Sequence, residues 1–340
     1  MKYSEKLRDV VSRTEIGKKF RCLICPNKCL ISPGDRGKCY VRKASNESVF
    51  LAEYGKVSSA AVEPIEKKPI YHFMPGSKVF SIGTLGCSFS CVYCQNHRIS
   101  QDQNCPVVDM PVSKAIDIAL HKGCDGVCMT YNEPIPSYEY LIELAEAAHK
   151  EGLYFALKTN GYAEKEPWRD ICEVTDAVNI DYKADSTENF ASITRVGSDA
   201  GISFRKILMR IQEAIEDDSI HVEMSLPLYT GSDDYSTFRG IISDVDRNVP
   251  VHILKVFPDH DSMKYSSTPN KSLFVLRDYL KEELNFVYVE NVFDEQGQEA
   301  RNTVCTKCGY VVVRRNKFDI YVTNSNCDEC SSSLVLQYER

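Results

Sequence analysis

The chain carries the sequence GCSFSCVYC at Gly86–Cys94, with three cysteines in the spacing C-x3-C-x2-C, just after the apolar run Val79–Ile82. A [4Fe–4S] cluster ordinarily takes four cysteine ligands, so a cluster held by three keeps one iron open to the amine and carboxylate of a small molecule. A structural zinc site closes with four ligands, often as C-x2-C pairs, and no fourth cysteine lies close enough in sequence to complete that pattern. The stretch, called the cluster loop below, therefore predicts an iron–sulfur site rather than a redox-inert metal clip. Its expected ligands are Cys87, Cys91 and Cys94.

A second cysteine group precedes the cluster loop, in the spacing C-x2-C-x3-C-x9-C, and is interleaved with prolines and glycines that let a backbone wrap a metal. Four thiolates can bind zinc tetrahedrally or hold a second iron–sulfur cluster. We expect zinc, with the second cluster as the alternative, because the irregular spacing does not decide between them. The ligands of this N-terminal cysteine group are Cys22, Cys25, Cys29 and Cys39.

A third group consists of two C-x2-C pairs that are separated by eighteen residues, the spacing of a zinc ribbon. The intervening segments 310–313 and 318–322 read as two strands, and Arg314, Arg315 and Lys317 as a small basic patch on them. A structural zinc would contribute about 10 kcal/mol or more to folding, and an iron centre of the rubredoxin kind is the alternative. The ligands of this C-terminal cysteine group are Cys305, Cys308, Cys327 and Cys330.

Composition excludes several classes of protein. The 340 residues carry a net charge of -7, which argues against a broad nucleic-acid surface. The start of the chain has no apolar signal segment and no apolar run reaches the length of a membrane span, so we expect a cytoplasmic protein without membrane contact. Eleven of the fifteen cysteines fall into the three groups, which indicates metal rather than disulfides. The remaining four are expected in the core: Cys105, Cys124, Cys128 and Cys172.

Residues 77–300 alternate between apolar runs and helical patterns, which predicts parallel βαβ units and a partial TIM-like (β/α)6 barrel in the α/β class. The expected strands are 78–83, 126–131, 154–160, 177–183, 220–227 and 251–257, with a seventh at 286–290. The expected helices are 113–122, 137–150, 202–216, 234–247 and 270–284. Residues 1–76 form an N-terminal metal-binding segment that starts with a polar helix or tail over 1–20, and residues 301–340 form a zinc-ribbon-like module.

Polar residues gather where the expected strands end, which is the edge at which βα barrels place their chemistry. They follow five different strands, so helix capping alone does not account for them. The connector 63–76, which leads into the first strand, adds Lys67, Lys68 and His72 as residues that could line the same site. The rim residues that we select are Asn132, Glu133, Thr159, Asn160, Asp181, Lys183 and His260, together with Tyr93, which would shield the cluster from water.

The cluster loop resembles the cysteine motif of the radical SAM superfamily, and the resemblance extends over nearly the whole chain, from Cys22 to the C-terminal cysteines. Within that superfamily the chain is similar to pyruvate formate-lyase activating enzymes and to the branch called AmmeMemoRadiSam system proteins. The resemblance implies a [4Fe–4S] cluster whose open iron binds S-adenosylmethionine (SAM), and an electron that cleaves SAM to a 5′-deoxyadenosyl radical. The protein's task is then binding, orientation and the exclusion of water.

The resemblance also assigns roles to the rim residues. Asn132 and Glu133 match the SAM-binding motif after the second strand, with Glu133 accepting from the SAM ammonium, and Thr159 and Asn160 match a Thr-Asn-Gly segment beside SAM. Asp181 and Lys183 match an Asp-x-Lys near the ribose and the carboxylate. Lys183 is the expected catalytic or SAM-carboxylate residue, with an ordinary ion pair to Asp181 as its alternative. His260 is either a ribose contact or an exposed loop histidine.

The resulting hypothesis is a radical SAM enzyme, an oxidoreductase of the activase type, that abstracts hydrogen from a macromolecular substrate. The resemblance implies a glycyl-radical partner protein as one substrate class, an electron donor of the flavodoxin or ferredoxin type, and association with Memo-like or AMMECR-type proteins. The alternatives are an RNA-modifying radical SAM enzyme and an iron–sulfur electron-transfer or scaffold protein that uses no SAM.

Overall fold

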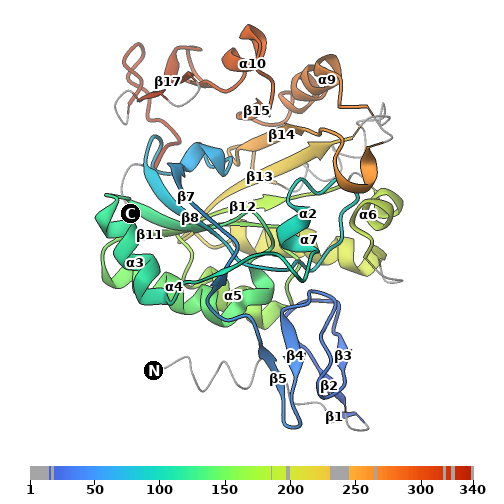
Figure 1. The fold of residues 1–340 in the computed structure, drawn as a ribbon. Helices are drawn as coiled ribbons and strands as arrows, with labels where there is room; N and C mark the ends of the chain where they lie inside the picture. The colour runs from blue at the N-terminus through green and yellow to red at the C-terminus, as the bar shows by residue number, and fades with distance from the viewer. Residues whose placement is uncertain are drawn as a thin grey trace.

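The computed structural model describes residues 15–16, 19–184, 186–196, 200–229, 245–263, 266–316, 319–322 and 326–337. Its centre is an eight-stranded sheet in the order β15-β14-β13-β12-β11-β10-β8-β7 (Figure 1). All neighbours from β8 to β15 pair in parallel, which confirms the expected α/β fold. The parallel strands are β8 (Lys78–Gly83), β10 (Gly126–Met129), β11 (Tyr154–Thr159), β12 (Ala177–Asp181), β13 (His221–Leu228), β14 (Val251–Lys255) and β15 (Val287–Glu290).

Helices join these strands and cover the outer face of the sheet (Figure 1). They are α3 (Val112–His121), α4 (Tyr138–Lys150), α5 (Lys165–Cys172), α6 (Thr187–Thr194), α7 (Ala200–Ile215) and α9 (Asn270–Leu280). In α3 the residues Ala115, Ile116 and Ala119 are buried, so one apolar stripe faces the sheet. The expected helix 234–247 lies largely outside the described residues, and its described end, 245–247, is not helical.

The sheet does not close, because its two edge strands β15 and β7 (Ser59–Pro64) are not neighbours in the strand order. β7 runs antiparallel to β8, from Ser59 opposite Gly83 to Pro64 opposite Lys78. The barrel sheet therefore begins before residue 77, in a segment where the sequence showed only short apolar runs and turns. The gap between β15 and β7 is called the seam below.

The N-terminal cysteine group lies on a small antiparallel unit below the barrel (Figure 1). Its strands are β1 (Glu15–Ile16), β2 (Lys19–Arg21), β3 (Leu30–Ile31), β4 (Arg42–Ala44), β5 (Val49–Leu51) and β6 (Lys56–Val57), the last pairing with β9 (Val108–Asp109). The helix or tail that was expected over 1–20 is wrong where the chain is described. Phe20 pairs with Ile31 and both side chains are buried, so packing against the cysteine turn favours strands there.

The C-terminal module lies at the opposite end of the view, beside the seam (Figure 1). It contains α10 (Glu295–Glu299), β16 (Thr303–Val304), β17 (Val311–Asn316) and β18 (Asp319–Val322). The expected basic patch is wrong for Arg315, which is 2% exposed, while Arg314 is exposed and Lys317 lies outside the described residues. Within the described part of the chain, no helix is both long and apolar enough to cross a membrane.

Candidate active site

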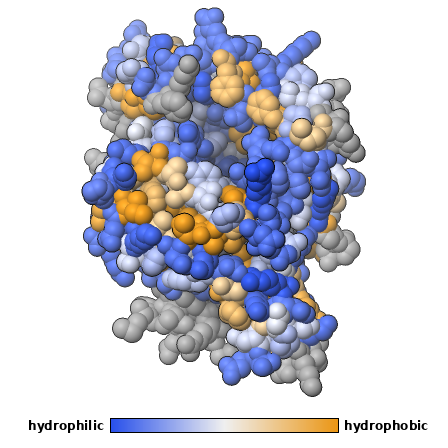
Figure 2. Space-filling view, viewed as in Figure 1, coloured by the Kyte–Doolittle hydropathy of each residue, from blue (hydrophilic) through white to orange (hydrophobic). Residues whose placement is uncertain are grey.

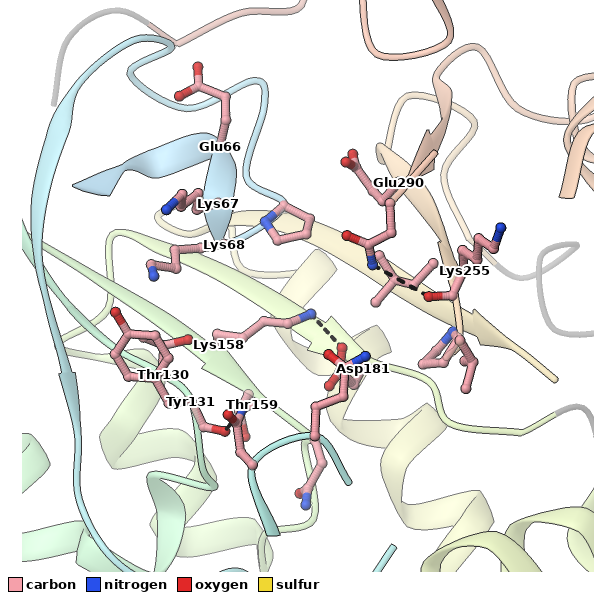
Figure 3. Close-up of a pocket in the computed structure, with 18 of the residues that line it drawn as sticks. Glu66, Lys67, Lys68, Thr130, Tyr131, Lys158, Thr159, Asp181, Lys255 and Glu290 are labelled. Carbon is pink, nitrogen blue, oxygen red and sulfur yellow. Dashed lines mark hydrogen bonds and ion pairs between the residues drawn. The ribbon is translucent and has the colours of Figure 1, made fainter. Parts of the chain in front are cut away.

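A cavity of about 730 Å³ opens at the carboxyl ends of the parallel strands. The face drawn in Figure 2 is hollowed beneath the C-terminal elements, and Figure 3 shows charged side chains around the cavity from opposite walls. Its volume lies in the range of small-molecule sites. The predicted site residues that line it are Cys87, Cys91, Tyr93, Cys94, Asn132, Glu133, Thr159, Asn160, Asp181 and Lys183. We call their side of the cavity the cluster end.

The cluster loop follows β8 and is fixed on both sides. Gly86 has φ +77, and a Cβ there would lie 2.1 Å from the carbonyl oxygen of Cys39, so this position requires glycine. The backbone N–H groups of Ser90 and Val92 donate to carbonyl oxygens of α6, each at 3.0 Å. Burial raises the pKa of the Cys91 thiol to about 12, so a bound metal must supply the charge that makes this sulfur a thiolate.

Glu133 joins the rims of two strands to one another. Its Oε1 accepts from the Thr159 hydroxyl at 2.6 Å and from the Ile135 N–H at 3.1 Å, and its Oε2 accepts from the Asn160 N–H at 2.7 Å. Burial raises the pKa of Glu133 to about 7, although these hydrogen bonds favour the charged form. The Asn160 side chain then donates to the Ser88 hydroxyl at 3.0 Å, which ties the network to the cluster loop.

Asn132 forms hydrogen bonds with the backbone at the start of the cluster loop. Its Oδ1 accepts from the Thr84 N–H at 3.0 Å, and its Nδ2 donates to the Gly86 carbonyl at 2.8 Å. Both ends of the amide are therefore engaged within the protein, and the residue positions the loop. The preceding Tyr131 has φ +72, a left-handed conformation that is costly for an aromatic residue and typical of functional sites.

Asp181 lies between two lysines on the floor of the cavity. It accepts from Lys158 (Figure 3) and, at 2.7 Å, from the Lys183 ammonium. Burial raises its pKa, but the two cations outweigh burial and hold the pKa at about 2. Lys158 is also bonded to Asn179 and Ser225, whereas Lys183 faces Tyr93 and Cys91. Two buried cations on one carboxylate leave an excess positive charge, which suits an anionic group such as a carboxylate.

His260 does not line the cavity. Its ring stacks on His97 with centroids 4.6 Å apart, in α2 (His97–Ser100) directly after the cluster loop. Its Nε2 lies 3.7 Å from Asp261, which pairs with Arg195 at 2.6 Å. His260 therefore lies outside the cavity lining, although its stacking partner directly follows the cluster loop.

The opposite side of the cavity, called the seam end below, was mostly missed by the sequence. Lys67 and Lys68 line the wall there as expected, and both pair with Glu63. His72 does not line the cavity, since it is buried and lies 2.6 Å from the Tyr288 hydroxyl. The seam-end residues that the sequence did not select include Glu66, Glu290, Arg301, Arg315 and Ile320.

Arg315 of the C-terminal module closes the seam. Its guanidinium donates to the Tyr71 carbonyl at 2.7 Å and to the Arg301 carbonyl at 2.9 Å. It also lies over the Tyr71 ring, 4.0 Å from the centroid, and 3.9 Å from Glu66. The alternation of strand β17 was the signal that could have found it, because Val313 and Arg315 lie on the same face of that strand.

The four C-terminal cysteines form a compact group. Their sulfurs all lie within 4.8 Å of one another, with Cys305 to Cys330 at 3.7 Å and Cys308 to Cys327 at 3.6 Å. Each C-x2-C turn is closed by the N–H of the residue after its second cysteine, at 2.9 Å for Gly309 and 2.8 Å for Ser331. This arrangement matches two knuckles around one tetrahedral ion.

The four N-terminal cysteines line one buried hollow, together with Ile24, Ile31 and Arg42. The remaining cysteines divide as follows: Cys124 and Cys128 are buried as expected, and Cys105 and Cys172 are partly exposed.

A three-cysteine loop that opens beside buried carboxylates and lysines at the rim of a parallel βα sheet places the chain among barrel enzymes that hold a metal cluster next to a small-molecule cofactor. A family model described as "Radical SAM superfamily" matches residues 81–234. "Uncharacterized protein MJ0808" of Methanocaldococcus jannaschii is 32% identical over 326 residues, which cover 93% of this chain and 95% of the relative. The chain belongs to the radical SAM superfamily, as its cluster loop predicted, and is therefore an enzyme of that superfamily.

Two further likenesses cover less of the chain or are more distant. The "Putative glycyl-radical enzyme activating enzyme MJ1632" of the same organism is 32% identical over 115 residues, 34% of this chain and 43% of the relative. The crystal structure of a radical SAM methyltransferase from Sphaerobacter thermophilus has a TM-score of 0.50 at 12% identity, and covers 70% of this chain and 71% of that chain. The latter shows a shared fold alone.

The cluster end fits the [4Fe–4S] cluster and SAM that the superfamily uses. Three thiols face the cavity, and the buried Tyr93 hydroxyl beside them finds no hydrogen-bond partner within the described chain. A carboxylate (Glu133) and a cation (Lys183) stand in the same cavity, which complements the ammonium and the carboxylate of a methionyl group.

Proposed function

We propose that the protein binds a [4Fe–4S] cluster at Cys87, Cys91 and Cys94 and uses it to cleave SAM reductively. One electron from a donor of the flavodoxin or ferredoxin type and one SAM would yield methionine and a 5′-deoxyadenosyl radical, which takes a hydrogen atom from the substrate. The observation that carries this proposal is that the three cysteines, Glu133 and Lys183 line one cavity.

The residues of the chain then have separate tasks. Lys183 binds the SAM carboxylate, because it carries the charge that Asp181 does not fully neutralise. Glu133 accepts from the N–H groups of the SAM amine on the lone pairs that its three internal donors leave free. Thr159, Asn160 and Asn132 hold Glu133 and the cluster loop in register. Tyr93 shields the cluster, with its ring edge-on to Tyr229 at 4.4 Å.

We propose a macromolecular substrate of the glycyl-radical enzyme type that reaches the cavity through the hollow in Figure 2. The partial likeness to the putative activating enzyme supports this choice. A Memo-like or AMMECR-type protein is a proposed partner, and a zinc ion in the C-terminal cysteine group is a proposed structural element, supported by its sulfur spacing.

The test is anaerobic incubation of the reconstituted protein with SAM and dithionite, with methionine and 5′-deoxyadenosine measured by chromatography. We expect both products in equal amounts, and neither in a Cys91→Ala variant. An iron-loaded protein that forms neither product would contradict the proposal and favour an electron-transfer or scaffold role. The Glu133→Ala variant should bind SAM more weakly in calorimetry; unchanged binding would remove the role assigned to Glu133.

A further inference from the structure

The N-terminal cysteine group is a built site rather than four scattered thiols. Cys22, Cys25 and Cys39 are each at most 9% exposed, and Cys29 faces the same hollow. The Cys22 N–H donates to the Cys29 carbonyl at 2.9 Å, and the Lys28 N–H donates to the Cys25 carbonyl at 3.0 Å. The chain thus turns back on itself so that all four side chains point to one place.

The spacing of the sulfurs separates this group from the C-terminal one. A zinc ion with Zn–S bonds of about 2.3 Å sets four sulfurs about 3.8 Å apart, which is the arrangement at the C-terminus. Among the residues that the structure describes, no other set of three or more cysteine, histidine or acidic side chains comes together closely enough to share one metal ion. The N-terminal cysteines therefore do not have the geometry of a single-ion site.

The cluster loop provides the standard for comparison inside the same molecule. Its three cysteines line one cavity, yet they too are not gathered around a single-ion position. A [4Fe–4S] cluster sets four irons and four sulfides between its ligands, so its cysteine sulfurs lie farther apart than those around one zinc. Like the three sulfurs of the cluster loop, the N-terminal sulfurs are not gathered as closely as the four at the C-terminus. This comparison rests on the proposed function, which assigns the cluster to that loop.

The surroundings of the N-terminal group also resemble those of the loop. In each group a backbone N–H donates to a cysteine sulfur at 3.4 Å, from Lys38 to Cys29 and from Phe89 to Cys87. Such bonds stabilise the negative charge on cluster sulfurs. The buried Arg42 also borders the hollow, where it donates to both carboxylate oxygens of Glu139, so a buried ion pair stands beside the cysteines.

The two groups are in direct contact. The Asn27 side chain donates to the Ser88 carbonyl at 2.9 Å, and Gly86 lies against the Cys39 carbonyl with no room for a Cβ. The Lys38 side chain is held by the Arg195 carbonyl at 2.8 Å and interacts electrostatically with thiols of both groups. We propose that Cys22, Cys25, Cys29 and Cys39 hold a second [4Fe–4S] cluster, coordinated by all four cysteines, beside the cluster that binds SAM.

The experiment removes the first cluster and leaves the N-terminal group intact. A triple variant Cys87→Ala/Cys91→Ala/Cys94→Ala is purified anaerobically and its iron, sulfide and zinc are measured. We expect about four irons and four sulfides per chain in this variant, and about eight of each in the unaltered protein. The matched control is Cys124→Ala/Cys128→Ala/Cys172→Ala, which removes three cysteines outside the groups and should keep about eight irons.

A triple variant without iron but with about two zinc ions per chain would overturn the proposal, since the N-terminal group would then hold zinc. The EPR spectrum of the reduced protein provides a second test, which leaves the N-terminal cysteine group unaltered. The signal that remains in the triple variant should be unaffected by SAM, whereas part of the signal of the unaltered protein should shift on SAM addition. Failure of the proposed function would appear separately, as an unaltered protein whose signal ignores SAM.

Discussion

At the cluster end of the cavity, Glu133 accepts a hydrogen bond from Asn160, 27 residues further along the chain, whereas at the seam end Arg315 donates to Tyr71 from a distance of 244 residues. The cluster end is a network between successive strands of one sheet, and each member follows a strand at the same edge. The seam end joins the two edges of that sheet through side chains of a separate module. The difference indicates that the cluster end is built by the barrel itself and that the C-terminal module shapes the far wall.

The largest effect of a substitution is expected at the cluster end, on the rate of SAM cleavage. Cys91→Ala removes one of three proposed ligands, so the cluster would no longer present its open iron to SAM, and SAM cleavage should fall below detection in the deoxyadenosine assay. Cys105→Ala, which lies outside the three cysteine groups, should retain full activity. Activity in the Cys91 variant would mean that the cluster end does not perform the chemistry.

The second-largest effect is expected at the seam, on the stability of the protein. Arg315→Met removes the hydrogen bonds to Tyr71, Arg301 and Thr303, and should lower the free energy of unfolding by about 3 kcal/mol. Arg314→Met, the exposed neighbour on the same strand, should change it by less than about 0.5 kcal/mol. Urea denaturation of the two variants measures the difference. Equal stabilities would show that the module does not close the seam.

A pH dependence of SAM binding would sharpen the cluster-end side of the comparison. Burial raises the pKa of Glu133 to about 7 in the free protein, and an amine N–H group that donates to the carboxylate favours the ionised form. SAM affinity should therefore be constant above pH 7 and fall about tenfold per pH unit below it. Calorimetry between pH 5.5 and 8 measures this slope. In Glu133→Gln the slope should disappear; a wild-type affinity that is flat below pH 7 would contradict the assignment.

The smallest expected effect is a difference in stability between substitutions at two adjacent lysines of the seam end. Lys68 is buried, pairs with Glu63 and lies over the Tyr131 ring at 4.6 Å, whereas the Lys67 side chain is 45% exposed. Lys68→Met should therefore lower the free energy of unfolding by about 1 kcal/mol, and Lys67→Met by at most about 0.5 kcal/mol. Thermal unfolding of both variants gives the ranking, and the reverse order would show that the wall does not depend on the buried pair.

The sequence predicted the barrel well because local patterns determine it. Each parallel strand is a short apolar run, and the expected strand 78–83 is β8 as observed. Glu133, Thr159 and Asn160 were selected because they lie at or just after strand ends, and topology brings strand ends together. The structure adds that Asn132 and Glu133 make most of their hydrogen bonds to other groups of the protein.

The seam leaves a weaker signal in the sequence than the barrel does. Arg315 lies in a strand with charged neighbours and looks like part of a solvated patch, and its burial depends on the fold of the whole chain. The same holds for Glu223, which is buried within β13 and accepts from the Tyr71 and His72 N–H groups at 2.7 Å each. A charged residue inside an apolar strand is the signal that could have revealed it, because such residues are buried only with partners.

The open sheet has a consequence for how relatives with this architecture diversify. Where strands pair, the backbone ladder fixes the side chains that line the cavity, and changing one strand disturbs its neighbours. Between β15 and β7 the wall is made of side chains such as Arg315, Glu66 and Tyr71, which single substitutions can replace. New substrates are therefore expected to be acquired at this side of the barrel, while the cluster end stays constant.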